Sequence, residues 1–292
     1  MDHEKVTGKR FFYVTVLNVL ITITEFLGGF FSGSLGLISD AFHNLEDSIS
    51  IVISYVANVI GKRKNNAQKT FGYKRAEILA AFVNSIVLVI ITLMMVVESI
   101  KRLSQPQEVN GKLMMIVSLI GLAANFVSML MLLSGSKHNL NIKATFLHML
   151  TDTLSSVGVF VASIFVILFN WNWVDPLITI LIAIWLLKEA YTVVSETINI
   201  LMEASPKIDL DAVQDAILTI PEIVKVHHVH VWMIDENHIM LDAHINVKKN
   251  CNMAELDTLY DQVDKMLNDK FHITHVTLQA ECSRGLDNSL ID

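Results

Sequence analysis

The chain has few charged residues and only two cysteines. Asp, Glu, Lys and Arg make up 17% of its 292 residues and hydrophobic residues 52%, whereas a typical globular domain has about 25% charged residues. This composition excludes a disordered chain and a single soluble core. The net charge of −7 gives no basic surplus for binding nucleic acid. The composition therefore predicts a membrane protein.

Several signatures are also missing. No small-residue cleavage site follows the long apolar stretch from Phe11, which excludes a signal peptide. There is no His-Glu-x-x-His motif, which intramembrane metalloproteases typically carry, and neither a nucleophilic serine motif nor a phosphate-binding loop. The sequence therefore predicts neither an enzyme nor an ATP-driven pump.

Six apolar segments are each long enough to cross a bilayer, which takes about 20 residues as a helix. Backbone groups in lipid must be satisfied within each segment, so helices are expected. The segments lie near 11–31, 36–60, 78–99, 113–134, 144–170 and 175–200.

The charge balance divides the chain. It is +1 over residues 1–205 and −8 over residues 206–292, which together with the apolar segments predicts a head (1–10), a transmembrane domain (11–205) and an acidic tail domain (206–292). Lys and Arg concentrate in the head and in the second and fourth loops, so both termini are expected in the cytoplasm. Cys251 and Cys282 would stay reduced there.

The tail shows a different periodicity. Helical spacing of apolar residues begins at Leu210, β-rich runs cover 224–233 and 237–247, an amphipathic helix covers 253–268, and a third strand covers 272–280. The order αββαβ predicts a small ferredoxin-like α/β domain. The predicted fold is thus an all-α six-helix transmembrane bundle followed by this domain.

One motif occurs twice inside apolar segments. His43 and Asp47 lie in the second segment, and His148 and Asp152 in the fifth. A spacing of four puts both side chains of each pair on one helix face. Ionisable groups in a span are costly and usually face the bundle interior. Two pairs brought together would supply two imidazole and two carboxylate ligands, a tetrahedral set suited to Zn²⁺.

These motifs resemble the cation diffusion facilitator family, in particular its bacterial zinc, cadmium and cobalt efflux branch. The resemblance covers essentially the whole chain and rests on the segment from Asn18 to Asp47, Phe71–Glu77, His148 with Asp152, Asp175–Pro176, Leu201–Pro206 and Val226–Trp232. It implies a homodimer in the bacterial inner membrane that exports Zn²⁺ in exchange for protons, with residues 11–205 as the transport domain. It further implies that the cytoplasmic tails (206–292) meet in the dimer and bind additional, regulatory Zn²⁺. It also implies His43, Asp47, His148 and Asp152 as transport ligands. Cadmium, cobalt and nickel, and potassium as a counter-ion, stay open.

Two features depart from the family pattern. The loop from Ser134 to Lys143 is short and holds only His138, so a metal-collecting loop is not expected. Glu46 lies about 100° from Asp47 around the helix, which favours a lining or interhelical role over a fifth ligand.

Other intramembrane polar residues have two alternative roles. Asn18, Glu25, Asn84 and Asn125 could join helices by hydrogen bonds. Glu25 and Asp40 could instead lie on a proton path. Asp175 is expected to start the sixth helix.

Seven of the eleven histidines lie in the tail. Strand alternation places His244 on a polar face and, on the last strand, His275 with Glu281. By resemblance, His227, His244 and Glu281 fall on metal-binding positions of some family tails, with His275 a further candidate and Asp257 and Cys282 weaker ones. Strand alternation would place the side chain of His227 on the same face as those of Val229 and Val231. His227 is therefore expected at the edge of the strand. His230 is expected to be structural.

A metal-selective channel and a membrane-embedded metal sensor are the alternatives to a proton-coupled antiporter. A sensor would not need two buried ligand pairs. A channel would use the same ligands, but would not move metal against a gradient.

Overall fold

The computed structural model describes residues 2–136, 140–248 and 252–291. Its first six helices are long and carry most of the apolar residues. Their bounds are α1 Asp2–Ser32, α2 Leu35–Gly61, α3 Ala76–Ser104, α4 Gly111–Ser136, α5 Leu140–Phe169 and α6 Val174–Leu201. Each covers one of the six predicted segments, and α1 also includes the predicted head. His138 and Cys251 lie outside the described residues.

Four of these helices are long and apolar enough to cross a membrane within the described residues. They are Ala76–Ser104, Gly111–Met131, Phe146–Phe169 and Val174–Leu201. In α1 the apolar stretch found among the described residues, Val16–Ser32, is shorter than such a span. In α2 the apolar run is interrupted by Asp40, Glu46 and Asp47. Of these, Asp47 and Asp40 are residues for which the sequence predicted a function.

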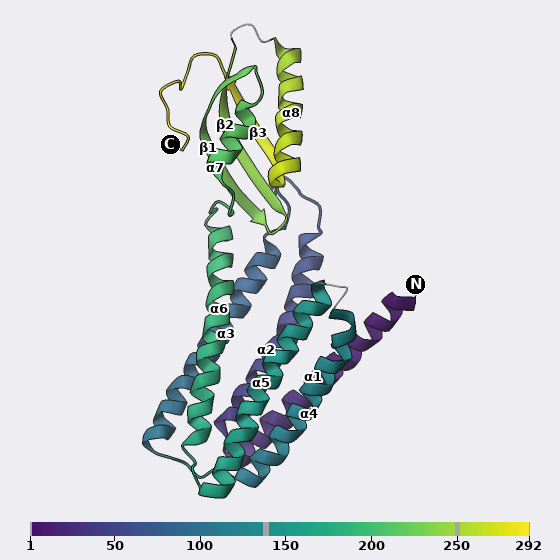
Figure 1. The fold of residues 1–292 in the computed structure, drawn as a ribbon, viewed down its shortest axis with the longest axis vertical. Coiled ribbons are helices and arrows are strands. Elements are labelled where there is room, and N and C mark those ends of the chain that lie inside the picture. Colours follow the sequence, from purple (N-terminus) through teal and green to yellow (C-terminus); the bar gives the residue numbers. More distant parts are fainter. Residues whose placement is uncertain (1, 137–139, 249–251, 292) are drawn as a thin grey trace. The chain divides into compact units, whose positions relative to one another are not determined.

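The chain forms two compact units, Met1–Val56 with Val83–Val194, and Ala57–Phe82 with Ser195–Asp292. In the first, α4 packs against α1 and α5 (Figure 1). A small apolar core joins α2, α4, α5 and α6, and consists of Leu37, Met114, Val117, Val159, Ala162 and Val174. This core lies at the end of the bundle where α2 begins.

The C-terminal part of the second unit has the predicted order of elements. It comprises α7 Leu210–Leu218, β1 Ile223–Asp235, β2 His238–Val247, α8 Met253–Phe271 and β3 Ile273–Glu281. β1 pairs with β2 antiparallel, and β2 pairs with β3 in parallel. The side chain of Asp209 caps α7, and Asn252 with Glu255 forms a capping box on α8. The αββαβ prediction is confirmed.

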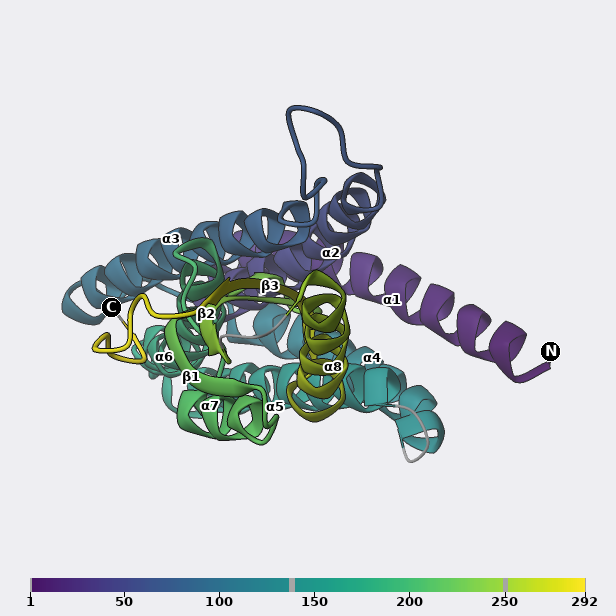
Figure 2. The same ribbon diagram turned by 90° about the horizontal axis from the view of Figure 1, so that it is seen from above.

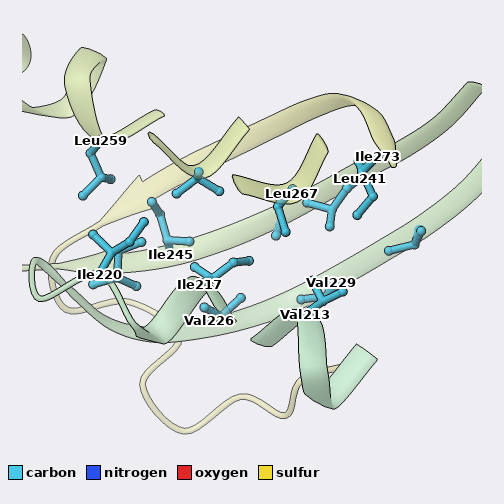
Figure 3. Packing of buried hydrophobic residues seen from close by; sticks show 14 of the residues in the cluster. Val213, Ile217, Ile220, Val226, Val229, Leu241, Ile245, Leu259, Leu267 and Ile273 are labelled. Atoms are coloured by element: carbon cyan, nitrogen blue, oxygen red, sulfur yellow. The ribbon is translucent and has the colours of Figure 1, made fainter. Parts of the chain in front are cut away.

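One face of this sheet is covered by α7 and α8, which lie on the same side of it (Figure 2). Apolar side chains from both helices meet those of the strands there, including Ile217, Leu267, Val226 and Leu241 (Figure 3). Because strand residues alternate between faces, His244 and Asn246 of β2 point to the opposite face.

A bulge changes the alternation of β1. The register between β1 and β2 shifts between His227 and His230, and His228 has a φ of 52°. The extra residue lets Val226, Val229 and Val231 all enter the core. The prediction that His227 shares a face with Val229 and lies at the strand's edge is therefore wrong: His227 is buried on the opposite face, at 1% exposure.

Candidate metal centre

The two His-x-x-x-Asp pairs meet within the first unit. His148 Nε2 on α5 lies 3.0 Å from Asp47 Oδ2 on α2, and His43 Nε2 on α2 lies 3.4 Å from Asp152 Oδ1 on α5. Within each pair the corresponding separations are 3.9 Å on α2 and 3.8 Å on α5. One ligand atom from each of the four residues lies within 4.8 Å of the others. Each histidine thus contacts the carboxylate of its own helix and that of the other helix.

Some polar atoms of this cluster lack hydrogen-bond partners in the part of the chain that the structure describes. His43 and Asp152 are buried, and His43 Nδ1 and both Asp152 carboxylate oxygens have no hydrogen-bond partner among the described residues. A buried polar atom without a partner is costly, and two carboxylates this close repel each other when both are ionised. A divalent cation bound by the two carboxylates would satisfy Asp152 and remove this repulsion.

The geometry fits a tetrahedral ion. Bonds of about 2.1 Å to nitrogen or oxygen place tetrahedral ligand atoms about 3.4 Å apart. The four His–Asp separations, 3.0, 3.4, 3.8 and 3.9 Å, lie on both sides of that value. Two imidazoles favour zinc over magnesium, calcium or manganese, which prefer all-oxygen sets.

A cavity of about 160 Å³ borders this cluster. Besides His43 and Asp152 it is lined mainly by apolar side chains of α5 and α6, among them Leu154, Ile182, Trp185 and Leu186. The cluster therefore borders a cavity between α5 and α6 rather than closely packed side chains.

Asp40 is held beside the cluster by α5. Ser155 and Ser156 both donate hydrogen bonds to its carboxylate, and Asn125 of α4 donates to Ser156 at 3.1 Å. Asp40 lies nearly one turn before His43 on α2 and is buried. These contacts join α2, α4 and α5 next to the two His–Asp pairs. The two serines carry no sequence signal that would have identified them.

Glu25 is buried between α1, α2 and α4. Asn44 donates to its Oε2 at 2.9 Å, while Oε1 has no partner among the described residues. A Cβ atom at position 121 would lie 2.3 Å from Oε1, so Gly121 permits this close approach of α4. In the same unit, Asn84 of α3 donates to Glu46 of α2. Glu46 thus makes an interhelical contact, in agreement with the sequence-based expectation.

Asp175 starts α6 as predicted, but it also caps α2. Its carboxylate accepts hydrogen bonds from the backbone nitrogens of Leu35 at 2.7 Å and Gly36 at 3.1 Å, and from the Ser34 hydroxyl at 2.6 Å. A carboxylate at a helix N-terminus satisfies backbone N–H groups that otherwise lack partners. This tie fixes the start of the helix that carries His43. No local pattern indicates that the cap comes from a residue 140 positions away.

A second cluster lies in the tail. His227 pairs with His244 across β1 and β2, and Asn246 pairs with Glu281 across β2 and β3. His227 Nε2 lies 3.3 Å from Glu281 Oε2, and His244 Nδ1 lies 3.4 Å from Glu281 Oε1. Both ring nitrogens of His227 and Glu281 Oε2 have no hydrogen-bond partner among the described residues. Three donors of types that bind zinc thus converge.

The glutamate of this cluster is kept ionised by its neighbours. Burial by itself would raise the pKa of Glu281, but the hydrogen bond from Gln279 and the nearby His244 and His227 outweigh it, so that the pKa is lowered. An ionised carboxylate is the form that binds metal.

The other tail candidates are not brought to this cluster. His275 pairs with Met240, six residues before Glu281 on β3, which corresponds to about 20 Å along a strand. Asp257 is exposed on α8, the helix that covers the other face. Cys282 follows Glu281 and is exposed. The ring of exposed His230 lies 4.6 Å from that of His228, whose ring is also 4.6 Å from His244.

Comparison with known families assigns both parts of the chain. Residues 11–202 match the cation efflux transmembrane domain, and residues 205–283 match the cytoplasmic domain of cation efflux proteins. Together the two matches cover nearly the whole chain, and the first alone covers more than half of it.

Individual relatives are similar over their full lengths. A cadmium, cobalt and zinc/H(+)-K(+) antiporter of Bacillus subtilis is 37% identical over 298 residues, covering 100% of this chain and 96% of the relative. The zinc transporter ZitB of Escherichia coli is 37% identical over 281 residues, covering 95% and 88%. The metal cation efflux system protein CzcD of Cupriavidus metallidurans is 35% identical over 281 residues, covering 96% and 88%. With both domains matched in order, and relatives this similar along the whole chain, the protein is a multi-pass membrane protein that belongs to the cation efflux family.

Proposed function

We propose that this protein exports Zn²⁺ from the cytoplasm in exchange for protons, with His43, Asp47, His148 and Asp152 as the transport ligands. The observation that carries the proposal is the convergence of these four side chains, from α2 and α5, within 4.8 Å. Relatives named as zinc transporters and as a zinc/H(+)-K(+) antiporter support it. Cd²⁺ and Co²⁺ are further candidate cargoes, because the same antiporter's name includes them. The activity requires no covalent chemistry, so no enzymatic function is proposed.

The same four residues would couple metal and proton movement. Zn²⁺ binds neutral imidazole and ionised carboxylate, so binding requires that His43 and His148 have lost their second proton. Histidine titrates near neutral pH. When the site faces a more acidic compartment, protons compete with the metal for the two rings and release it. The protonated site then returns to the cytoplasmic side. Asp40 and Glu25, both buried in the same unit, are proposed to lie on the path of these protons.

The tail is proposed to regulate transport. The match to the cytoplasmic domain indicates dimerisation, and we propose a homodimer formed through both the transmembrane and the tail domains. Zn²⁺ on His227, His244 and Glu281 would offset the repulsion between two tails of charge −8. The proposed division is a head (1–10), a transport domain (11–205) and a tail (206–292). The protein would lie in the bacterial inner membrane with both termini in the cytoplasm, as the distribution of Lys and Arg indicates.

Transport in vesicles tests this function. The purified protein is reconstituted with a zinc dye inside, a pH gradient is imposed with the lumen acidic, and zinc entry is followed. His148→Ala is compared with His275→Ala, which removes an exposed histidine outside both clusters. We expect gradient-driven uptake in wild type and in His275→Ala, and none in His148→Ala.

Two results would contradict the proposal. Uptake that runs only down the zinc gradient and ignores pH would indicate a channel. Uptake that persists in His148→Ala at the wild-type rate would mean that the cluster on α2 and α5 is not the transport site.

A further inference from the structure

The residues after β3 fold back over the tail cluster. We call residues 284–290 the strap; they lie beyond the part of the chain that matches the cytoplasmic domain of the family. Leu290 accepts a backbone hydrogen bond from Val229 at 2.8 Å, and Arg284 accepts one at 2.8 Å from the Asn246 side chain. Both ends of the strap are thus attached to strands that carry cluster residues.

Lys225 attaches the middle of the strap. Its Nζ donates to the carbonyl oxygens of Gly285 at 3.4 Å, of Asn288 at 2.7 Å, and of Leu286. Hydrogen bonds from a charged donor are stronger than neutral ones. Lys225 lies two residues before His227 on β1, so the strap is held directly beside that ligand.

Gly285 lies against the His227 ring. A Cβ atom at position 285 would lie 2.4 Å from His227 Nε2 and 2.2 Å from Cε1, so only glycine permits this approach. The backbone there also has a φ of +65°, which favours glycine. Most strap residues are exposed, whereas His227 beneath them is 1% exposed. The strap therefore covers the nitrogen that faces Glu281.

We infer that the strap closes the tail cluster, and that metal enters or leaves His227, His244 and Glu281 only when residues 284–290 lift. This inference rests on the proposed metal binding of that cluster. Local opening of a segment held by a few hydrogen bonds is an ordinary low-energy event in proteins. If the strap makes the same contacts with and without bound metal, it changes the rate at which metal enters and leaves the cluster. It does not change the affinity of the cluster for metal. The tail site would then hold its metal through short changes in cytoplasmic zinc.

Exchange kinetics in the full-length protein test the inference. The detergent-solubilised protein carries Asp47→Ala and Asp152→Ala, so that the tail is the only proposed site left. It is loaded with Zn²⁺ and mixed with excess EDTA, and the zinc retained is measured over time. Lys225→Met keeps the aliphatic stem but removes the ammonium group. Lys265→Met is the matched control, because Lys265 is exposed on α8, on the other side of the sheet.

We expect Lys225→Met to release zinc at least about tenfold faster, as for the loss of one hydrogen bond to a charged group, while the zinc dissociation constant changes less than about threefold. Lys265→Met should match the parent. A chain ending at Arg284 lacks most of the strap and should also release zinc faster, so the test does not depend on one variant folding.

Chemical modification gives a readout without metal. Diethyl pyrocarbonate modifies accessible imidazoles, and mass spectrometry separates His227 from exposed His275 as an internal reference. We expect His227 to react slowly in the parent and at least about fivefold faster in Lys225→Met, relative to His275.

The possible failures are distinguishable. If the parent binds no zinc, or if substitution of His244 and Glu281 does not remove the zinc that it binds, the proposed tail site is wrong. The strap then has no metal site to close. If it binds such zinc, but release and His227 modification are unchanged in Lys225→Met and in the shortened chain, the strap inference alone is wrong.

Discussion

The carboxylate of Asp175, at the start of α6, accepts a 2.7 Å hydrogen bond from the backbone nitrogen of Leu35, the first residue of α2. Only four residues separate α5 from α6, so this bond also joins the α5–α6 turn to the start of α2. The two helices that carry the proposed metal ligands are thereby fixed at the same end of the bundle. At that end Gly36 of α2 also faces Val159 of α5, whose Cγ2 would lie 3.2 Å from a Cβ at position 36.

Asp175→Ala should therefore destabilise the bundle. It removes three buried hydrogen bonds, and loss of a helix cap costs roughly 1–2 kcal/mol. The unfolding midpoint in detergent should fall, with Asp175→Asn in between because its amide oxygen keeps one acceptor. Equal midpoints for all three proteins would show that the cap does not stabilise α2.

Removal of one transport ligand should abolish tight metal binding. Changes to groups that only orient metal ligands already cost about 10–100-fold in affinity, so His43→Ala or Asp152→Ala should cost at least about 100-fold. Isothermal titration with Zn²⁺ measures this, in a protein whose tail cluster is disabled by His244→Ala. Glu46→Gln is the control and should bind zinc like its parent, since Glu46 is not one of the four converging residues and its carboxylate accepts a hydrogen bond from Asn84 of α3. A 100-fold loss in Glu46→Gln would identify Glu46 as a ligand.

Zinc affinity at the transport site should fall as pH falls. Two imidazoles must be neutral to bind zinc. Below the pKa of the free histidines, the logarithm of the zinc association constant should therefore fall by up to about two for each unit that the pH falls. In His148→Ala, which leaves one imidazole, the slope should fall to about one. Competition with a zinc dye between pH 5.5 and 8 measures both slopes. A wild-type slope of zero would exclude proton competition at this site.

The bulge in β1 should restrict which residues position 228 accepts without loss of stability of the tail. His228 has a φ of 52°, a conformation that glycine adopts freely and β-branched residues strongly disfavour. His228→Val should destabilise the tail by about 1–2 kcal/mol, whereas His228→Gly should retain zinc binding. Thermal unfolding followed by circular dichroism compares the variants. If His228→Val is as stable as the wild type, the bulge does not constrain this position.

Much of the architecture was predictable from local patterns. Each of the six apolar segments forms a helix because its length and composition leave the backbone no other way to satisfy its hydrogen bonds in lipid. The tail order αββαβ followed from changes in periodicity. The pairing of His43 with Asp47, and of His148 with Asp152, follows from a helical spacing of four. Glu46, one residue from Asp47, lies about 100° further around the helix and accepts a hydrogen bond from Asn84 of α3.

Tertiary structure decided what depends on contacts between distant segments. Spacing along one helix cannot show that His148 Nε2 reaches Asp47 on another, because this depends on how α2 and α5 pack. His275 had the right residue type and strand face, but its register opposite Met240 separates it from Glu281. His227 reaches His244 and Glu281 because the bulge at His228 shifts the alternation by one residue, which allows Val226 and Val229 both to enter the core. Periodicity assumes a regular strand, so it could not place His227, and nothing local indicated that Gly285 would cover it.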